Sequence, residues 1–187
     1  MGTTAAPYGA VPWHNTDGNY SVATRERKIA SGYATKICYN DFVKNVNDGS
    51  IAKDTGTTTL TSCGIFRGCK YTDSTGSPVY SQHWPASTVA SDAVAFVCED
   101  PHLVFIMQAD GSLDVTAVGA NAGVTQTAGS ASLSGNALTA STVATTGTLP
   151  IRILGIKPGP GNAAGDAYTE AICAFNAGHQ LLNTTGV

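Results

Sequence analysis

Residues 94–111 read VAFVCEDPHLVFIMQADG, and this stretch decides the fold class. It contains two nearly all-apolar runs, Val94–Cys98 and Leu103–Gln108, which are typical of central strands. An Asp-Pro pair between the runs favours a loop, and the Asp-Gly pair that ends the stretch favours a turn. The stretch therefore predicts two neighbouring strands in the middle of a sheet.

Segments on both sides of this stretch also favour strands. Apolar and β-branched residues recur with strand-like spacing in Tyr33–Asp41, Thr57–Cys63, Ser62–Tyr71, Leu149–Ile156 and Ala167–Asn176. Turn residues separate them at intervals of ~8–20 residues, which predicts an all-β fold, either a compact β-barrel or a sandwich. Short helices are expected at most, near Asp41–Val46 and Ser87–Ala93.

Residues 1–24 have the composition of an N-terminal arm, and residues 25–187 that of the β-rich domain. The arm holds two prolines, three glycines and the aromatic residues Tyr8, Trp13 and Tyr20. Burying one such ring contributes on the order of 2–3 kcal/mol, so an exposed arm with three of them is expected to have a binding use. The alternative is an arm that folds back on its own domain, and the sequence leaves both open.

Charge is scarce along the chain. Only 12% of the 187 residues are charged and the net charge is −3, with no basic run longer than Arg25-Glu26-Arg27-Lys28. Nucleic-acid binding needs a basic face, so no nucleic-acid partner is expected. The stretch Val115–Ile151 has no charge, but nearly half of it is Ser, Thr or Gly. That composition is too polar for a membrane span and indicates a surface or interface element.

The five cysteines form no Cys-x-x-Cys motif, and two of them lie in apolar runs. Buried reduced thiols that act as small hydrophobic residues are the expectation, in keeping with synthesis in a reducing cytoplasm. The first residues show no basic segment followed by an apolar run, so no secretory signal is expected.

Motifs that carry chemistry are scarce as well. Asp54-Thr55-Gly56 matches the aspartic-protease triplet as a string, but it lies in a polar context that favours a turn. Asp100-Pro101-His102 is the closest approach of a histidine to a carboxylate, and a capped loop explains it. No catalytic residue, metal site or cofactor is therefore expected, and the chain is not expected to be an enzyme. A small hydrolase built from Asp54 and His102 is the least favoured reading.

Several short patches, in this order, resemble a class of tailed-phage structural proteins described as head decoration or cement proteins. The patches are Ile37–Val43, Gly64–Tyr71, Tyr80–Pro85, Asp100-Pro101 with Phe105–Gly111, Leu149–Gly155, Asn162 and Asn176–Gln180.

This resemblance implies a β-barrel-like module that binds the outer surface of a bacteriophage capsid and stabilises it. The implied partners are the major capsid protein and further copies of the chain, as a homotrimer or alternatively a dimer, on the virion exterior. The residues expected at a capsid or subunit interface are Tyr8, Trp13, Tyr20, Arg25 and Arg27. The alternative function is a tail-associated or lectin-like module, in which Trp13, Tyr20 and Trp84 stack on carbohydrate.

Overall fold

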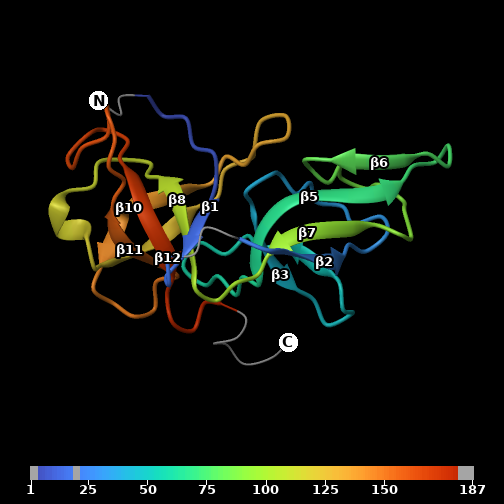
Figure 1. Cartoon of the computed structure of the whole chain (residues 1–187), viewed down its shortest axis with the longest axis horizontal. Helices are drawn as coiled ribbons and strands as arrows, with labels where there is room; N and C mark the ends of the chain where they lie inside the picture. The colour runs from blue at the N-terminus through green and yellow to red at the C-terminus, as the bar shows by residue number, and fades with distance from the viewer. Residues whose placement is uncertain (1–3, 19–21, 181–187) are drawn as a thin grey trace.

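The computed structural model describes residues 4–18 and 22–180, and this part of the chain is all-β. Two antiparallel sheets lie along the long axis of the molecule, sheet A on the left of Figure 1 and sheet B on the right. The described residues contain one 3-10 turn, η1 (Val115–Ala117), and form no helix in either of the two ranges where short helices were expected. The predicted all-β class is therefore confirmed.

Sheet A has six strands in the order β1-β8-β12-β11-β9-β10. Sheet B has the order β2-β7-β5-β3-β4, and β6 pairs with the free half of β5. The bounds are β1 Val11–Asn15, β2 Thr24–Lys28, β3 Phe42–Asn45, β4 Ile51–Lys53, β5 Gly64–Thr72, β6 Pro78–Ser81, β7 Val94–Cys98, β8 Leu103–Gln108, β9 Asn121–Thr125, β10 Ala137–Ala144, β11 Ile151–Ile156 and β12 Glu170–Phe175.

Two hydrophobic clusters stabilise the sheets. In the first, Phe42 of sheet B lies 5.8 Å from Phe105 and 5.6 Å from Phe175 of sheet A, measured between ring centroids. The second cluster lies under sheet B and is built around Trp84 and Phe66. Because side chains of both sheets share the first cluster, the sheets pack together as in a sandwich.

Neither sheet closes into a barrel within the described residues. In sheet A the edge strand β10 forms one isolated bridge, between Leu138 and Ala109 directly after β8, and the edges of sheet B meet at one isolated bridge between Ile29 and Ile51. A closed barrel needs a continuous ladder between its first and last strands. Of the two architectures expected from the sequence, the sandwich is the one that fits.

Five predicted strands are confirmed. The stretch that decided the fold forms β7 and β8 with the predicted bounds. β5 overlaps nearly all of the predicted range 62–71, and β11 and β12 lie within the predicted ranges 149–156 and 167–176. Their apolar patterns identify them because these strands supply many of the buried residues of the two hydrophobic clusters.

Two other predicted strands are wrong. Tyr33–Asp41 has one bridge at Ile37 and another at Tyr39, because the chain turns at Asn40, whose φ is 71°. Thr57–Cys63 has a single bridge, at Ser62, and belongs to the loop between β4 and β5 of sheet B. β-Branched composition alone does not provide the neighbouring strand that a ladder needs.

The predicted short helices are also wrong. Residues 42–45 form β3, which pairs with both β4 and β5. Residues 87–93 are turns and bends, and Ser87 has a left-handed φ of 59°. A residue in that conformation interrupts a right-handed helix.

The uncharged stretch is not simply a surface element. It contains β9, which is largely buried, and the edge strand β10, which pairs with it. β9 lies between β11 and β10, so small residues such as Ala122 and Gly123 suit a position enclosed on both sides. The interpretation of this stretch as a surface element was therefore wrong for β9.

The extended N-terminal arm is not confirmed. The described residues before position 24 include β1, which pairs with β8 at the edge of sheet A (Figure 1). The Gly9 amide donates to the Asn136 carbonyl at 3.1 Å, and Ala10 is fully buried in the first cluster. This part of the chain folds back on the body, the alternative that the sequence left open. Tyr20 lies outside the described residues.

Gly9 allows this close approach, and replacing it with alanine is expected to destabilise the fold. Its φ is 76°, and an added Cβ would lie 2.4 Å from the Asn40 carbonyl oxygen. Gly49 has a similar φ of 79° but nothing within 4 Å, so Gly49→Ala measures the backbone strain alone. We expect Gly49→Ala to cost about 1–2 kcal/mol and Gly9→Ala a further ~1–3 kcal/mol from overpacking, both measured by urea unfolding. Equal losses for the two variants would contradict the packing of this segment.

Candidate functional site

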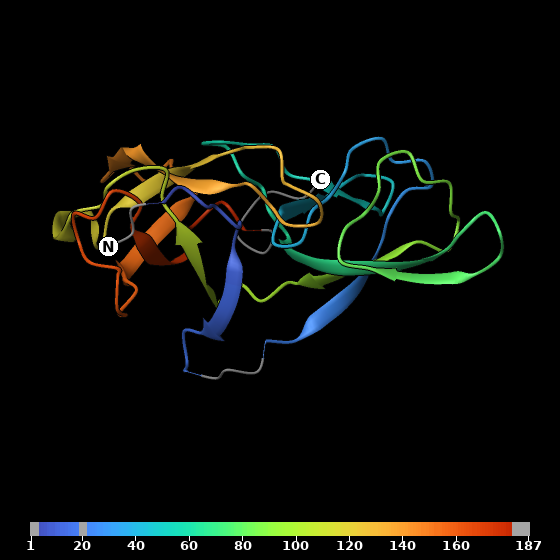
Figure 2. The ribbon, with the colours of Figure 1, turned by 90° about the horizontal axis from the view of Figure 1, so that it is seen from above.

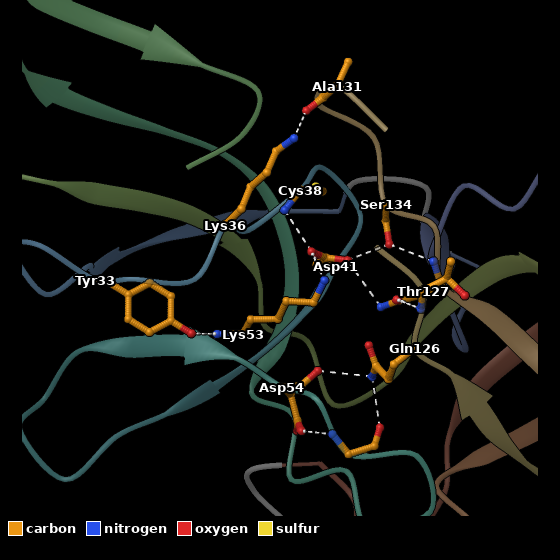
Figure 3. A network of polar contacts seen from close by, with 12 residues as sticks. Tyr33, Lys36, Cys38, Asp41, Lys53, Asp54, Gln126, Thr127, Ala131 and Ser134 are labelled. Carbon is orange, nitrogen blue, oxygen red and sulfur yellow. Dashed lines mark hydrogen bonds and ion pairs between the residues drawn. The ribbon is translucent and has the colours of Figure 1, made fainter. Parts of the chain in front are cut away.

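The most polar part of the interior lies where the two sheets meet, around the carboxylate of Asp41 (Figure 3). Asp41 is fully buried and follows the turn at Asn40, directly before β3. One oxygen, Oδ2, accepts from the Cys38 amide at 2.8 Å and lies 2.8 Å from Lys53 Nζ. The other, Oδ1, accepts from the Ser134 hydroxyl at 2.6 Å and from Asn136 Nδ2 at 3.2 Å.

These four contacts define what Asp41 does chemically. Its donors come from β4, from the loop before β3 and from the segment that leads into β10, so one carboxylate joins both sheets. A general base needs a lone pair directed at a substrate proton. Both oxygens of Asp41 already accept from protein donors, which makes this carboxylate a structural tie.

A hollow of about 350 Å³ opens beside this tie and is lined from both sheets. Lys36 donates to the Ala131 carbonyl across it, and Gln126 Nε2 donates to the carbonyls of Asp54 and Gly56 at 3.1 and 2.9 Å (Figure 3). Burial raises the pKa of the Cys38 thiol, and the nearby Asp41 raises it further. The thiol is therefore protonated at neutral pH and is a poor nucleophile. The lining residues are Thr35, Lys36, Cys38, Lys53, Thr55, Gln126, Thr127, Ala128 and Gly129.

All five cysteines are free and buried, as the sequence predicted. Burial raises the pKa of both Cys63 and Cys69 to about 12, and that of Cys98 to about 11.

Asp54, of the protease-like triplet, lies close to the same hollow but binds backbone amides. Its oxygens accept from Gly56 N at 3.0 Å and Thr61 N at 2.9 Å, so the carboxylate shapes the loop between β4 and β5. Asp100 likewise accepts from His102 N at 2.8 Å in the turn between β7 and β8. The interpretation of residues 100–102 as a capped loop is confirmed.

Arg25 and Arg27, two of the residues expected at an interface, lie together on the edge strand β2. Both line a hollow of about 200 Å³ that Glu99 also borders. Arg27 forms two hydrogen bonds with the Glu99 carboxylate, one of them 2.6 Å from Nη2 to Oε2. The hydrogen bond to Glu99 is the main reason that the pKa of Arg27 is raised. Arg25 is exposed, so it is the one of this pair that remains open to a partner.

Tyr8 and Trp13 lie on the sheet A side and make internal contacts. The Tyr8 hydroxyl donates to Glu170 Oε1 at 2.7 Å, and Glu170 Oε2 lies 2.6 Å from Lys157 Nζ. Burial raises the pKa of Tyr8, and the Glu170 carboxylate raises it further. The Trp13 ring is half-buried beside His14, with 4.6 Å between ring centroids.

Trp84 cannot be the sugar-stacking platform of the alternative function. It is fully buried, its Nε1 donates to the Tyr33 carbonyl at 3.2 Å, and its ring centroid lies 5.5 Å from that of Tyr71. A stacking platform must present its ring to solvent. The carbohydrate reading was therefore wrong at this residue.

The exposed apolar side chains form the candidate interaction surface, and sequence reasoning did not select them. Three of them belong to two adjacent segments, one at and after η1 and the other β11, where Gly119 N donates to Ile153 O at 2.9 Å. We call Val115, Val118 and Leu154 the η1 patch; their exposed fractions are 63%, 43% and 44%. The sequence shows apolar residues beside turns at these positions, but whether such a residue is buried or exposed cannot be read without the fold. The other exposed large apolar residues are Tyr80, Val89 and Leu133.

Two further searches cover the part of the chain that the structure describes. Residues 4–18 and 22–180 bring no three His, Cys, Asp or Glu side chains together in a group that could hold a metal ion. They also form no helix of the length and hydrophobicity that crossing a membrane requires. Comparison of the whole chain with family models, curated proteins and solved structures finds no match.

Proposed function

We propose that this chain is a structural virion protein that binds the outer surface of a tailed-phage capsid and stabilises it. The observation that carries the proposal is the η1 patch, three exposed apolar side chains on two adjacent segments of an all-β body. Contiguous exposed apolar groups are typical of protein interaction sites. The ordered sequence patches that resemble decoration proteins supply the identity of the partner.

The interior is consistent with a protein that works by binding. Its most polar feature, around Asp41, is occupied by contacts that join the two sheets. A protein that binds the assembled shell and not the free subunits stabilises the shell by mass action. Repeated copies on a fixed lattice multiply that effect. A chain with few charges, whose two sheets are joined by the contacts of Asp41, suits a rigid module with this role.

The proposal predicts a high copy number in purified particles. Quantitative mass spectrometry of particles that carry this chain is expected to find it in many copies, on the order of hundreds per particle. Removal of the chain is expected to lower the temperature at which the shell releases its contents. A count of a few copies, or none, would overturn the assignment.

The same experiment tests the η1 patch. Val118→Asp places a charge in the patch and is expected to reduce the copy number at least tenfold, because an unpaired charge in an interface is costly. Val89→Asp is the matched control, since Val89 is an exposed valine in the segment before β7 and outside the patch. Circular dichroism and the unfolding midpoint of both variants should match the wild type. Equal incorporation of both variants would show that another surface meets the shell.

A further inference from the structure

The strands β6, β5, β7 and β2 form a sheet surface whose two sides differ. One side carries Phe66, Ala95 and Val97, which are buried in the second cluster with Trp84. In Figure 2 loops lie over that side. On the other side Ile65 and Cys98 are buried in the first cluster, and no described segment covers the part along β6 and the adjoining half of β5. A sheet with one buried side and one open side presents the open side to solvent or to a partner.

Strand register identifies the side chains on the open side. Lys70 pairs with both Val94 and Tyr80, and Glu26 pairs with Phe96. Directly paired residues project from the same side of a sheet, as do residues two apart on one strand. We define the open face by these five residues, Glu26, Lys70, Tyr80, Val94 and Phe96, together with Lys28, which pairs with Val94.

The open face combines exposed aromatic surface with charges of both signs. Tyr80 is 77% exposed, so most of its ring is available to a partner. Lys70 Nζ lies 2.6 Å from Glu26 Oε1 and 5.7 Å from the centroid of the Phe96 ring. The Lys70 ammonium and the Glu26 carboxylate therefore meet above the ring of Phe96, on the strand between β5 and β2.

This charge arrangement favours a second copy of the same face over an unrelated partner. In a contact across a twofold axis, if one residue of the first copy contacts a second residue of the other copy, the same contact occurs again with the two copies exchanged. A face that carries both signs, with Glu26 as well as Lys28 and Lys70, can place Lys70 against Glu26 of the other copy twice. Aromatic residues at the centre of such a contact supply most of its affinity.

We propose that the open face binds the open face of a second copy of this chain across a twofold axis, with Tyr80 and Phe96 at the centre and Glu26 and Lys70 exchanged between copies. The proposed dimer rests on the proposed function for its location on a capsid shell. The two can fail separately, because self-association is measured on the purified chain and decoration is measured on particles.

The test uses two charge reversals, Glu26→Lys and Lys70→Glu, in the full chain. Each variant breaks the ion pair within the chain and places like charges opposite each other between identical copies. In a mixture of the two variants, the lysine introduced at position 26 meets the glutamate introduced at position 70 of the other variant. The native Lys70 and Glu26 also meet between the two variants. Mixing therefore restores both contacts between copies while both pairs within the chains stay broken.

Analytical ultracentrifugation over a range of concentrations gives the readout. We expect the wild type to form dimers, each reversal to weaken the dimer at least tenfold, and the mixture to recover most of the wild-type affinity. A monomeric wild type, or reversals that associate like the wild type, would overturn the proposal. Failure of the mixture to recover would overturn it as well, because the effect would then belong to the pair within the chain.

A second pair of variants tests the aromatic centre. Tyr80→Ala is expected to weaken the dimer about tenfold or more, since a truncated aromatic at an interface centre is costly. Val115→Ala, at the η1 patch, removes an exposed apolar side chain outside the open face and is expected to leave the dimer unchanged. Equal dissociation constants for the two variants would place the contact elsewhere.

Discussion

Replacing Asp41 with alanine is expected to lower the free energy of unfolding by about 3–5 kcal/mol, as loss of one partner from a buried ion pair does. The variant leaves the Lys53 ammonium unpaired, with only 11% of its side chain exposed. It also removes the acceptor for the Cys38 amide and for the Ser134 and Asn136 side chains. Equilibrium unfolding in urea, with the slope checked against the wild type, measures the loss.

Two further variants identify the origin of that loss. The double variant Asp41→Ala/Lys53→Met is expected to cost about 0.5–3 kcal/mol less than the sum of its two single variants, because it leaves no unpaired charge. Lys157→Met breaks a partly exposed pair with Glu170 and is expected to cost about 1 kcal/mol or less. Additive losses at Asp41 and Lys53, or equal losses at Asp41 and Lys157, would contradict the role of Asp41 as the tie between the sheets.

The stretch 94–111 predicted its two strands because each is a nearly continuous apolar run bounded by turn residues, and each forms an interior strand of its sheet, so composition alone identifies them. The segment at Tyr33–Asp41 has a similar alternation but forms no strand. Its amide at Cys38 bonds to the Asp41 side chain, and its chain direction changes at Asn40. A side chain that competes for backbone donors is invisible in a hydrophobic pattern. Strands that depend on a distant partner, such as β1 and β9, were missed as well, because the strand with which each pairs cannot be read from a local hydrophobic pattern.

The candidate surfaces were harder to predict than the strands. Sequence reasoning chose aromatic residues, because aromatics are common at interfaces, and so it selected Tyr8, Trp13 and Trp84. The fold uses Tyr8 for a bond to Glu170 and buries Trp84 completely. It exposes Tyr80 instead, on a short edge strand that pairs with only part of β5. Aromatic identity is readable from sequence, whereas the side of the sheet it faces is set by register.

The buried tie and the open face use the chain's few charges in opposite ways. Asp41 and Lys53 meet in the interior, where removing either leaves the other without its opposite charge. Glu26 and Lys70 meet at the surface, where water screens them until a second surface excludes it. Variants of the first pair are therefore expected to change stability at any protein concentration. Variants of the second pair are expected to change self-association with little effect on the isolated chain.

Replacing Trp84 with alanine is expected to lower the free energy of unfolding by about 3–5 kcal/mol, the usual cost of removing a large core aromatic. Trp84 is fully buried, packs edge-on against Tyr71 and joins Ile37 through an isolated bridge, so its loss leaves a cavity at the centre of the second cluster. The Tyr33 carbonyl also loses the Nε1 donor.

Tyr80→Ala is the matched control for this variant, because it truncates an aromatic residue on the opposite side of the same sheet. At protein concentrations too low for dimers, its unfolding midpoint should stay close to that of the wild type, since most of the side chain is already in water. If Trp84→Ala were as stable as Tyr80→Ala, the indole could not lie in the core, and the carbohydrate reading of Trp84 would regain its basis. If the two variants separate as expected, Trp84 holds the loops at Tyr33 and Ile37 against sheet B.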